Sequence, residues 1–216
     1  YDRFGIPENL REHMLTVARV AMLISENWKS QDLDKDLIKK AALVHDLANI
    51  VKFKLEENSP LKPKQTDMIA KYGSDDHQAT QKMLKELGMD DQLIAIVQNK
   101  SFGNAFVVEA SHDYSLKILF YSDMRVAPSG VVDLKTRLND VVTRLERYRT
   151  HPQKNELMQN NWTDNFIWKI SKNFEDAKNY QYPINIWFLI IEEFPKLMFL
   201  LIRIWVYIYL SHQVFL

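Results

Sequence analysis

The chain has 216 residues and no cysteine, which excludes disulfide bonds and thiolate-rich zinc sites. Glycine and proline, which interrupt helices, occur only five and seven times, and the long periodic segments between them favour an all-α fold. The formal net charge is zero, which argues against an extended nucleic-acid surface. The lack of cysteine agrees with a cytoplasmic location, and no signal-peptide pattern is present. The first residue, Tyr1, leaves the natural start of the chain open.

What the sequence does contain is ionisable residues on helical stripes that are otherwise apolar. His13 lies on the apolar stripe of its segment, between Leu10 and Val17. Asp123 closes a second stripe, which begins at Leu116 and continues at i+3 and i+4. Both side chains are therefore expected to face a core.

A third segment carries the adjacent pair His45 and Asp46. Apolar residues 41–44 precede the pair and Leu47 follows it, so the run predicts a buried helix. Neighbouring residues on a helix point about 100° apart, which lets both side chains reach one ion. Burying ionisable groups without partners is costly, so three such segments predict a shared metal ion rather than coincidental buried polar groups.

The predicted ligand set is two imidazoles and two carboxylates. This mixture suits one divalent ion: manganese, ferrous iron, cobalt, nickel or zinc, with magnesium also allowed. Four protein ligands on an octahedral ion leave positions for water and a substrate oxygen, which a hydrolytic metal site needs.

Three sequence elements carry a family resemblance: NLREHMLTVARVA, AALVHDLANI and ILFYSDMRV. Their order, His, then His-Asp, then Asp, resembles the HD-domain superfamily of metal-dependent phosphohydrolases over residues 1–150. The resemblance implies an all-α helical bundle around a metal and hydrolysis of a phosphate ester or anhydride, commonly of a nucleotide. Carried over by position, His13, His45, Asp46 and Asp123 would be the metal ligands, and Asp46 would also orient or deprotonate the attacking water.

The signature departs from the form His-Asp-Ile-Gly-Lys that many members have. Asn49 stands at the lysine position, where it is expected to hydrogen-bond a ligand or the substrate. Lys52, three residues on, is predicted to contact the substrate phosphate and take part in catalysis. Two-metal members carry further histidines, whereas Gln98-Asn99-Lys100 stands near the place of one such pair, so a two-metal site is not expected.

Two further residues are candidates for substrate contact. His77 follows the capping sequence Ser74-Asp75-Asp76 and would lie in the first turn of a helix stopped by Gly88, where free N–H groups favour anions. It is predicted as a catalytic and phosphate-binding residue, with a surface histidine near a cap as the alternative. Arg125 is predicted to contact substrate, with a structural ion pair as the alternative.

The remaining sequence sets the domain organisation. His112-Asp113 is an isolated pair in polar surroundings and is interpreted as a loop or helix start. The basic stretch 135–149 is interpreted as a solvated helix face. Helices are predicted at 8–28, 34–51, 64–72, 75–87, 90–100, 104–127 (with an interruption around His112) and 131–149. A linker with an accessory helix would occupy 151–180.

The last segment, 181–216, is an atypical hydrophobic tail. Its final twenty residues contain one arginine, Arg203, and are long enough to span a bilayer, although the arginine is costly there. Membrane association through 184–216, packing on the domain or in a dimer interface, and a non-native end are all open.

Two functions are weighed. The first is a metal-dependent phosphohydrolase acting on a small phosphorylated, nucleotide-like substrate. The second is a catalytically silent metal-binding HD module that senses a phosphorylated ligand. The intact set of four ligands favours the enzyme.

Overall fold

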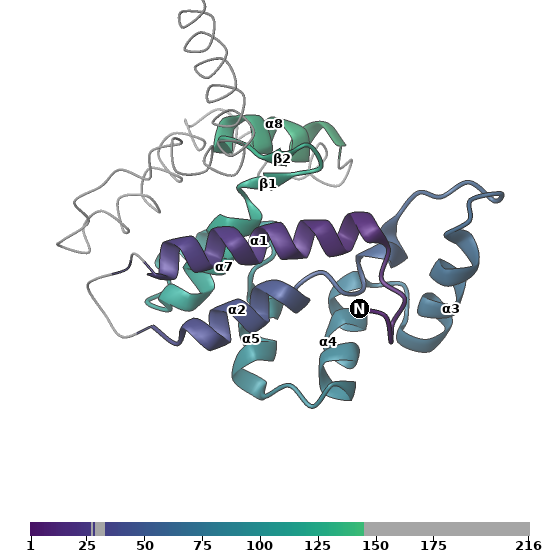
Figure 1. Cartoon of the computed structure of the whole chain (residues 1–216), viewed down its shortest axis with the longest axis horizontal. Helices are drawn as coiled ribbons and strands as arrows, with labels where there is room; N and C mark the ends of the chain where they lie inside the picture. The colour runs from purple at the N-terminus through teal and green to yellow at the C-terminus, as the bar shows by residue number, and fades with distance from the viewer. Residues whose placement is uncertain (27, 29–32, 145–216) are drawn as a thin grey trace, which may run out of the picture. The chain divides into compact units, whose positions relative to one another are not determined.

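The computed structural model describes residues 1–26, 28 and 33–144, all within the first of two units, Tyr1–Asn179 and Tyr180–Leu216. The described part is mostly helical (Figure 1). Its α-helices are α1 (Glu8–Glu26), α2 (Lys35–Val44), α3 (Lys62–Tyr72), α4 (Asp76–Glu86), α5 (Asp91–Asn99), α6 (Ala105–Ala110), α7 (Tyr114–Asp123) and α8 (Leu134–Arg144). Two short 3-10 helices, η1 (Asn49–Lys52) and η2 (Phe102–Asn104), lie between them.

A small antiparallel hairpin corrects the all-α prediction. Strands β1 (Val126–Ala127) and β2 (Gly130–Val131) pair directly after α7, in the region where the sequence predicted helix up to residue 127. Gly130 has φ +110°, a backbone conformation that side chains disfavour, and it follows Pro128 in the turn. Helix α7 has already ended at Asp123, and the turn residues after β1 send the chain back on itself.

Aspartates fix the starts of five described helices. Asp34, Asp75, Asp90, Asp113 and Asp133 each accept a hydrogen bond from the backbone N–H three residues on, at 2.8 to 3.1 Å. This contact satisfies one of the N–H groups that a helix start leaves free. It confirms that the His112-Asp113 pair marks a helix start.

The core lies where α1 packs against α2 and α7 (Figure 1). Its centre includes the fully buried side chains of Met14, Val17, Ile38 and Leu119. Helix α2 also packs against α5 and α7. This packing brings the middle of α1 next to the end of α7, although the two are separated by more than one hundred residues in the sequence.

The signature segment is not one continuous helix, which corrects the prediction over 34–51. Helix α2 ends at Val44, residues 45–48 form a turn, and η1 follows. Leu47 and Ala48 are buried, so the apolar run enters the core as predicted. A short run that is apolar on all sides carries no periodicity that separates a helix from a buried turn.

The predicted helix over 104–127 is interrupted at 111–113, where the sequence allowed a break. The Oγ of Ser111 accepts a hydrogen bond from the backbone N–H of Asp113 at 2.9 Å. Such local side-chain bonds compete with the helical hydrogen-bond ladder.

The helices predicted at 8–28, 64–72, 75–87 and 90–100 are present, with ends that shift by one or two residues. The predictions for 145–149, the linker 151–180 and the tail 181–216 lie outside the described residues. Among the residues that are described, no helix is both long and apolar enough to cross a membrane.

Candidate metal centre

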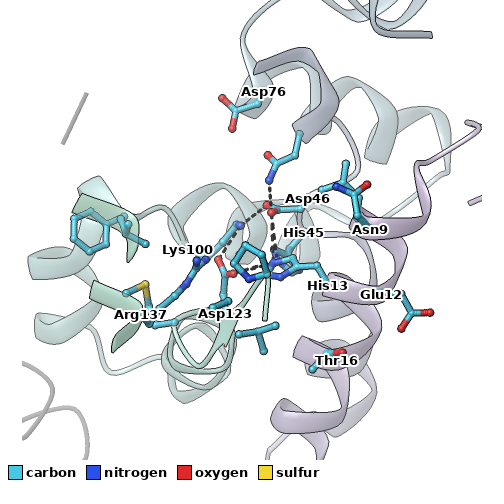
Figure 2. A pocket seen from close by; sticks show the side chains of 18 of the residues that line it. Asn9, Glu12, His13, Thr16, His45, Asp46, Asp76, Lys100, Asp123 and Arg137 are labelled. Atoms are coloured by element: carbon cyan, nitrogen blue, oxygen red, sulfur yellow. Dashed lines mark hydrogen bonds and ion pairs between the residues drawn. The ribbon is translucent and has the colours of Figure 1, made fainter. Parts of the chain in front are cut away.

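The cluster begins with contact between two distant helices. His13 projects from the middle of α1, and Asp123 is the last residue of α7. The Nε2 atom of His13 lies 3.2 Å from Oδ1 of Asp123 (Figure 2). The predicted first and last ligands are therefore neighbours.

His45 presents one ring nitrogen to the same place. Its Nδ1 lies 2.7 Å from the backbone oxygen of Ala42, and because a carbonyl only accepts, Nδ1 carries the proton. The Nε2 atom then has a free lone pair, is buried, and has no hydrogen-bond partner in the described part of the chain. It lies 3.6 Å from Oδ1 of Asp123. A buried acceptor without a donor is costly, so this atom points to a cation.

Asp46 adds a second carboxylate on the same side. Its Oδ2 lies 3.7 Å from Nε2 of His13 and 3.8 Å from Nε2 of His45. Asn49 donates a hydrogen bond from its side-chain amide to the same oxygen. The predicted contact of Asn49 is thus made with Asp46, a predicted ligand.

These residues fit a divalent metal ion. Ligand atoms of His13, His45 and Asp123 all lie within 4.8 Å of one another. Bonds of about 2.1 Å allow two ligand atoms on one ion to be up to about 4.2 Å apart. The four distances between a histidine Nε2 and an aspartate oxygen, 3.2 to 3.8 Å, meet this condition. The proton on Nδ1, held by a backbone carbonyl, is the usual support of a metal-binding histidine. The identity of the metal stays a prediction.

Lys100 is a site residue that the sequence prediction missed. It follows the last residue of α5, and its side chain is 8% exposed. The Nζ atom lies 2.6 Å from Oδ1 of Asp46 and 3.2 Å from Oδ2 of Asp123. Figure 2 shows it next to the two carboxylates. The sequence analysis considered Lys100 only as part of Gln98-Asn99-Lys100, which stands near the place of a histidine pair in two-metal members, and assigned it no role in the site.

The charges of the cluster are strongly coupled. Burial by itself would raise the pKa of Asp46 and of Asp123, but the ammonium of Lys100 holds both pKa values below their ordinary range. Burial would likewise lower the pKa of Lys100, but the carboxylates of Asp123 and Asp46 raise it. Both acids are therefore ionised at neutral pH, as metal ligands must be.

The cluster opens into a pocket of about 520 Å³ (Figure 2). Lys52, Phe53, Asp76 and His77 line one part of it. The hairpin and α8 contribute another part, which includes residues 126–130, Arg137 and Val141. The metal cluster therefore faces a cavity of the size that small-molecule sites have.

The predicted substrate contacts divide into two groups. Lys52, Asn49 and His77 all line the pocket. Arg125 is not among the lining residues. It is buried, donates from Nε to the backbone oxygen of Val132 at 2.7 Å, and donates from Nη1 to the hydroxyl of Tyr121 at 2.9 Å. These hydrogen bonds fasten the segment after the hairpin to α7, so Arg125 has a structural role, but through uncharged partners and not through the ion pair named as the alternative.

Arg137 is a second residue that the sequence prediction missed. It belongs to the stretch interpreted as a solvated face, yet its side chain is 11% exposed and lines the pocket. Its Nη1 lies 2.6 Å from Oδ2 of Asp140, and its buried Nε has no partner in the described part of the chain. The solvated-face interpretation is therefore wrong at this position.

A family comparison matches this architecture. Residues 10–105 match the model of the HD domain. The chain contains an HD domain. His13, His45 and Asp46 fall inside the matched segment, whereas Asp123 and Arg137 follow it. HD domains are typically metal-dependent phosphohydrolases, which agrees with the predicted class and leaves the substrate open. Searches among curated proteins and among solved structures find no match.

Proposed function

We propose that this HD domain is a phosphohydrolase that uses one divalent ion to cleave a phosphate ester or anhydride of a small nucleotide-like substrate. The observation that carries the proposal is the cluster of His13, His45 and Asp123 at the pocket, with Asp46 beside both histidines and Nε2 of His45 buried and unpartnered in the described part of the chain. A bound cation would satisfy the lone pair of this atom, and the adjoining pocket has room for a small substrate.

The residues have distinct chemical roles in this proposal. A divalent ion held by the four ligands would lower the pKa of a water and offset charge on phosphoryl oxygens. Asp46 is ionised and has one oxygen facing the two histidines, so it can orient the attacking water and accept its proton. Asn49 fixes that carboxylate by donating to it.

Cations around the pocket suit a phosphorylated substrate. Lys52 of η1 lines the pocket. Arg137 of α8 also lines it and is labelled in Figure 2. The N-terminal turn of α4 contains His77, which also lines the pocket. Helix starts and basic side chains both stabilise anions. These three residues are the proposed phosphate contacts.

The pocket also has features that suit a nucleotide. The rings of Phe53 and Phe102 line it, together with Pro128 of the hairpin. Aromatic and apolar surfaces bind flat rings, while the cations bind phosphate. A phosphorylated nucleoside contains both parts, which supports it as the substrate class.

One observation favours the alternative function, a silent module that senses a phosphorylated ligand. Both oxygens of Asp46 already accept a hydrogen bond, Oδ1 from Lys100 and Oδ2 from Asn49. A carboxylate held in this way is a weaker proton acceptor. In this reading the pocket binds the ligand and no bond is cleaved.

Turnover separates the two functions. The full chain is stripped with a chelator, reloaded with manganese, cobalt, nickel, iron or magnesium, and assayed against nucleotides and a generic phosphate ester. Metal-dependent hydrolysis that disappears in Asp46→Asn, while the variant keeps its helical circular-dichroism spectrum, supports the enzyme. Stoichiometric metal binding without hydrolysis of any substrate contradicts it and favours the sensor.

A further inference from the structure

Each of the two carboxylates of the cluster turns one oxygen to Lys100 and the other toward the two histidines. Asp46 directs Oδ1 to Nζ of Lys100 and Oδ2 toward Nε2 of both histidines. Asp123 directs Oδ2 to the same Nζ and Oδ1 toward the same two ring nitrogens. Lys100 thus contacts only the oxygens that face away from the predicted metal position.

We infer that Lys100 is a positioning residue that clamps Asp46 and Asp123, so that each presents one oxygen to the histidines before any ion binds. The inference rests on the proposed metal site and deepens it. The clamp assembles the site in the metal-free protein and sets each carboxylate to bind through one oxygen. Lys100 touches no reacting atom in this role.

Electrostatics explain why a clamp is needed. Two buried carboxylates that point at one place repel each other, and burial adds a desolvation cost. The ammonium of Lys100 lies within 3.2 Å of both and is itself nearly inaccessible to solvent. Its charge therefore offsets the repulsion that would otherwise push the two side chains apart in the absence of a metal.

The inference is testable because a lysine that acts only through its charge would have the opposite effect on metal affinity. A lysine that merely adds positive charge beside a cation site weakens metal binding, so removing it would strengthen binding. A lysine that positions the ligands strengthens metal binding, so removing it would weaken binding. The direction of the change decides between these roles.

Lys52 supplies a matched control. Its Nζ also pairs with a carboxylate in the same pocket, 2.7 Å from Oδ2 of Asp76. Asp76 is not among the predicted ligands. Lys52→Met and Lys100→Met therefore each remove one ammonium from an ion pair, but only the second frees the metal-facing carboxylates.

The first measurements are manganese affinity by titration calorimetry and thermal stability without metal, on the full chain. We expect Lys100→Met to bind manganese about 10- to 100-fold more weakly, the usual loss when a residue supporting a metal ligand is removed. We expect it also to melt at a lower temperature than Lys52→Met when metal-free. Unchanged or tighter manganese binding in Lys100→Met would overturn the inference.

The lack of cysteine in the chain allows a chemical rescue. A Lys100→Cys variant is aminoethylated while unfolded and then refolded, which restores an ammonium at nearly the reach of lysine. The parent chain taken through the same treatment is the control. Recovery of manganese affinity on aminoethylation supports the clamp, and affinity that stays at the level of the unmodified Lys100→Cys contradicts it.

The effect of Lys100→Met on metal affinity can be distinguished from effects on folding and on turnover. If Lys100→Met folds only with manganese present, preassembly by Lys100 is supported, and its affinity is measured by competition with a chelator. The d–d absorption of bound cobalt reports the ligand arrangement and should change in Lys100→Met but not in Lys52→Met. Weaker metal binding in Lys100→Met alongside no hydrolysis by any variant, the parent included, supports the clamp and counts against the proposed function alone.

Discussion

The Nζ atom of Lys52 lies 2.7 Å from Oδ2 of Asp76, which joins η1 to the first turn of α4 at the pocket. The Lys52 side chain remains 31% exposed, whereas that of Asp76 is 10% exposed. The lysine therefore has a fixed position and still reaches solvent, as a phosphate contact requires.

Replacing Lys52 with methionine should impair hydrolysis without loss of the fold. We expect kcat/KM to fall by about 100-fold, the lower end of the loss when one donor to a developing anion is removed. Steady-state kinetics with the best substrate from the nucleotide panel measures this. Asp76→Asn keeps the ammonium and should lower kcat/KM much less, and equal losses in the two variants would count against a phosphate contact.

Arg137 should bind the substrate anion through the part of its guanidinium that Asp140 does not hold. Arg137→Lys keeps the charge but loses the planar fork, and a charged hydrogen bond contributes roughly 1.5–3 kcal/mol. We therefore expect KM to rise by about 10-fold or more. Asp140→Asn leaves the guanidinium in place and serves as the control. A KM for Arg137→Lys equal to that of the parent would remove Arg137 from the substrate site.

Metal binding should stabilise the fold through His45. Manganese at 100 times its dissociation constant raises the free energy of unfolding by about 2.7 kcal/mol when it binds only the folded state. Thermal melts with and without manganese should show this shift in the parent and not in His45→Gln. The control is His112→Gln, at the helix start outside the pocket lining. A full shift in His45→Gln would show that the metal binds elsewhere.

The acid side of the stability profile should depend on Glu86. The hydroxyl of Tyr72 donates to it at 2.6 Å, and this bond together with Lys71 and Arg3 lowers its pKa from 4.5 to about 2. Because the folded state has the lower pKa, the stabilisation is fully present above the unfolded value and is lost as the pH falls toward 2.

Comparison with Glu86→Gln isolates this effect. The difference in melting temperature between the parent and the variant should be constant above about pH 5 and shrink between pH 4.5 and 2. A difference that is the same at pH 3 and pH 7 would contradict the assignment.

The site residues on apolar helical stripes could be predicted from the sequence, because an ionisable side chain at a position that faces the core stands out among apolar neighbours. His13 and Asp123 stand where a helical stripe requires an apolar side chain, and both reach the cluster. Lys100 follows the same rule, since Leu93 and Val97 precede it at i−7 and i−3 and all three are buried. It was missed because a lysine at a helix end is usually solvated, and its two carboxylate partners lie far away in the sequence.

Other parts of the site depend on tertiary contacts that the sequence leaves open. The break after Val44 has no local signal, because the apolar residues 41–44 and 47–48 on either side of His45 and Asp46 would be buried in a helix and in a turn alike. The role of Arg125 depends on Val132, which the hairpin returns to it. Arg137 lies in a charge-rich segment, where the sequence signal for an inward face is limited to Leu134 at i−3 and Val141 at i+4, and Val141 also lines the pocket.

The hydrogen bonds from Arg125 to Tyr121 and Val132 lie at the junction between two walls of the pocket, one that carries the predicted metal ligands and one that faces the rest of a substrate. The predicted metal ligands come from α1, the turn after α2 and α7, whereas the hairpin and α8 form another wall of the pocket. Residues 126–141 can therefore change in length and composition while the ligand cluster keeps its arrangement. Substrate preference is expected to evolve through this wall, and exchanging the hairpin between related HD domains should transfer selectivity while leaving metal affinity unaltered.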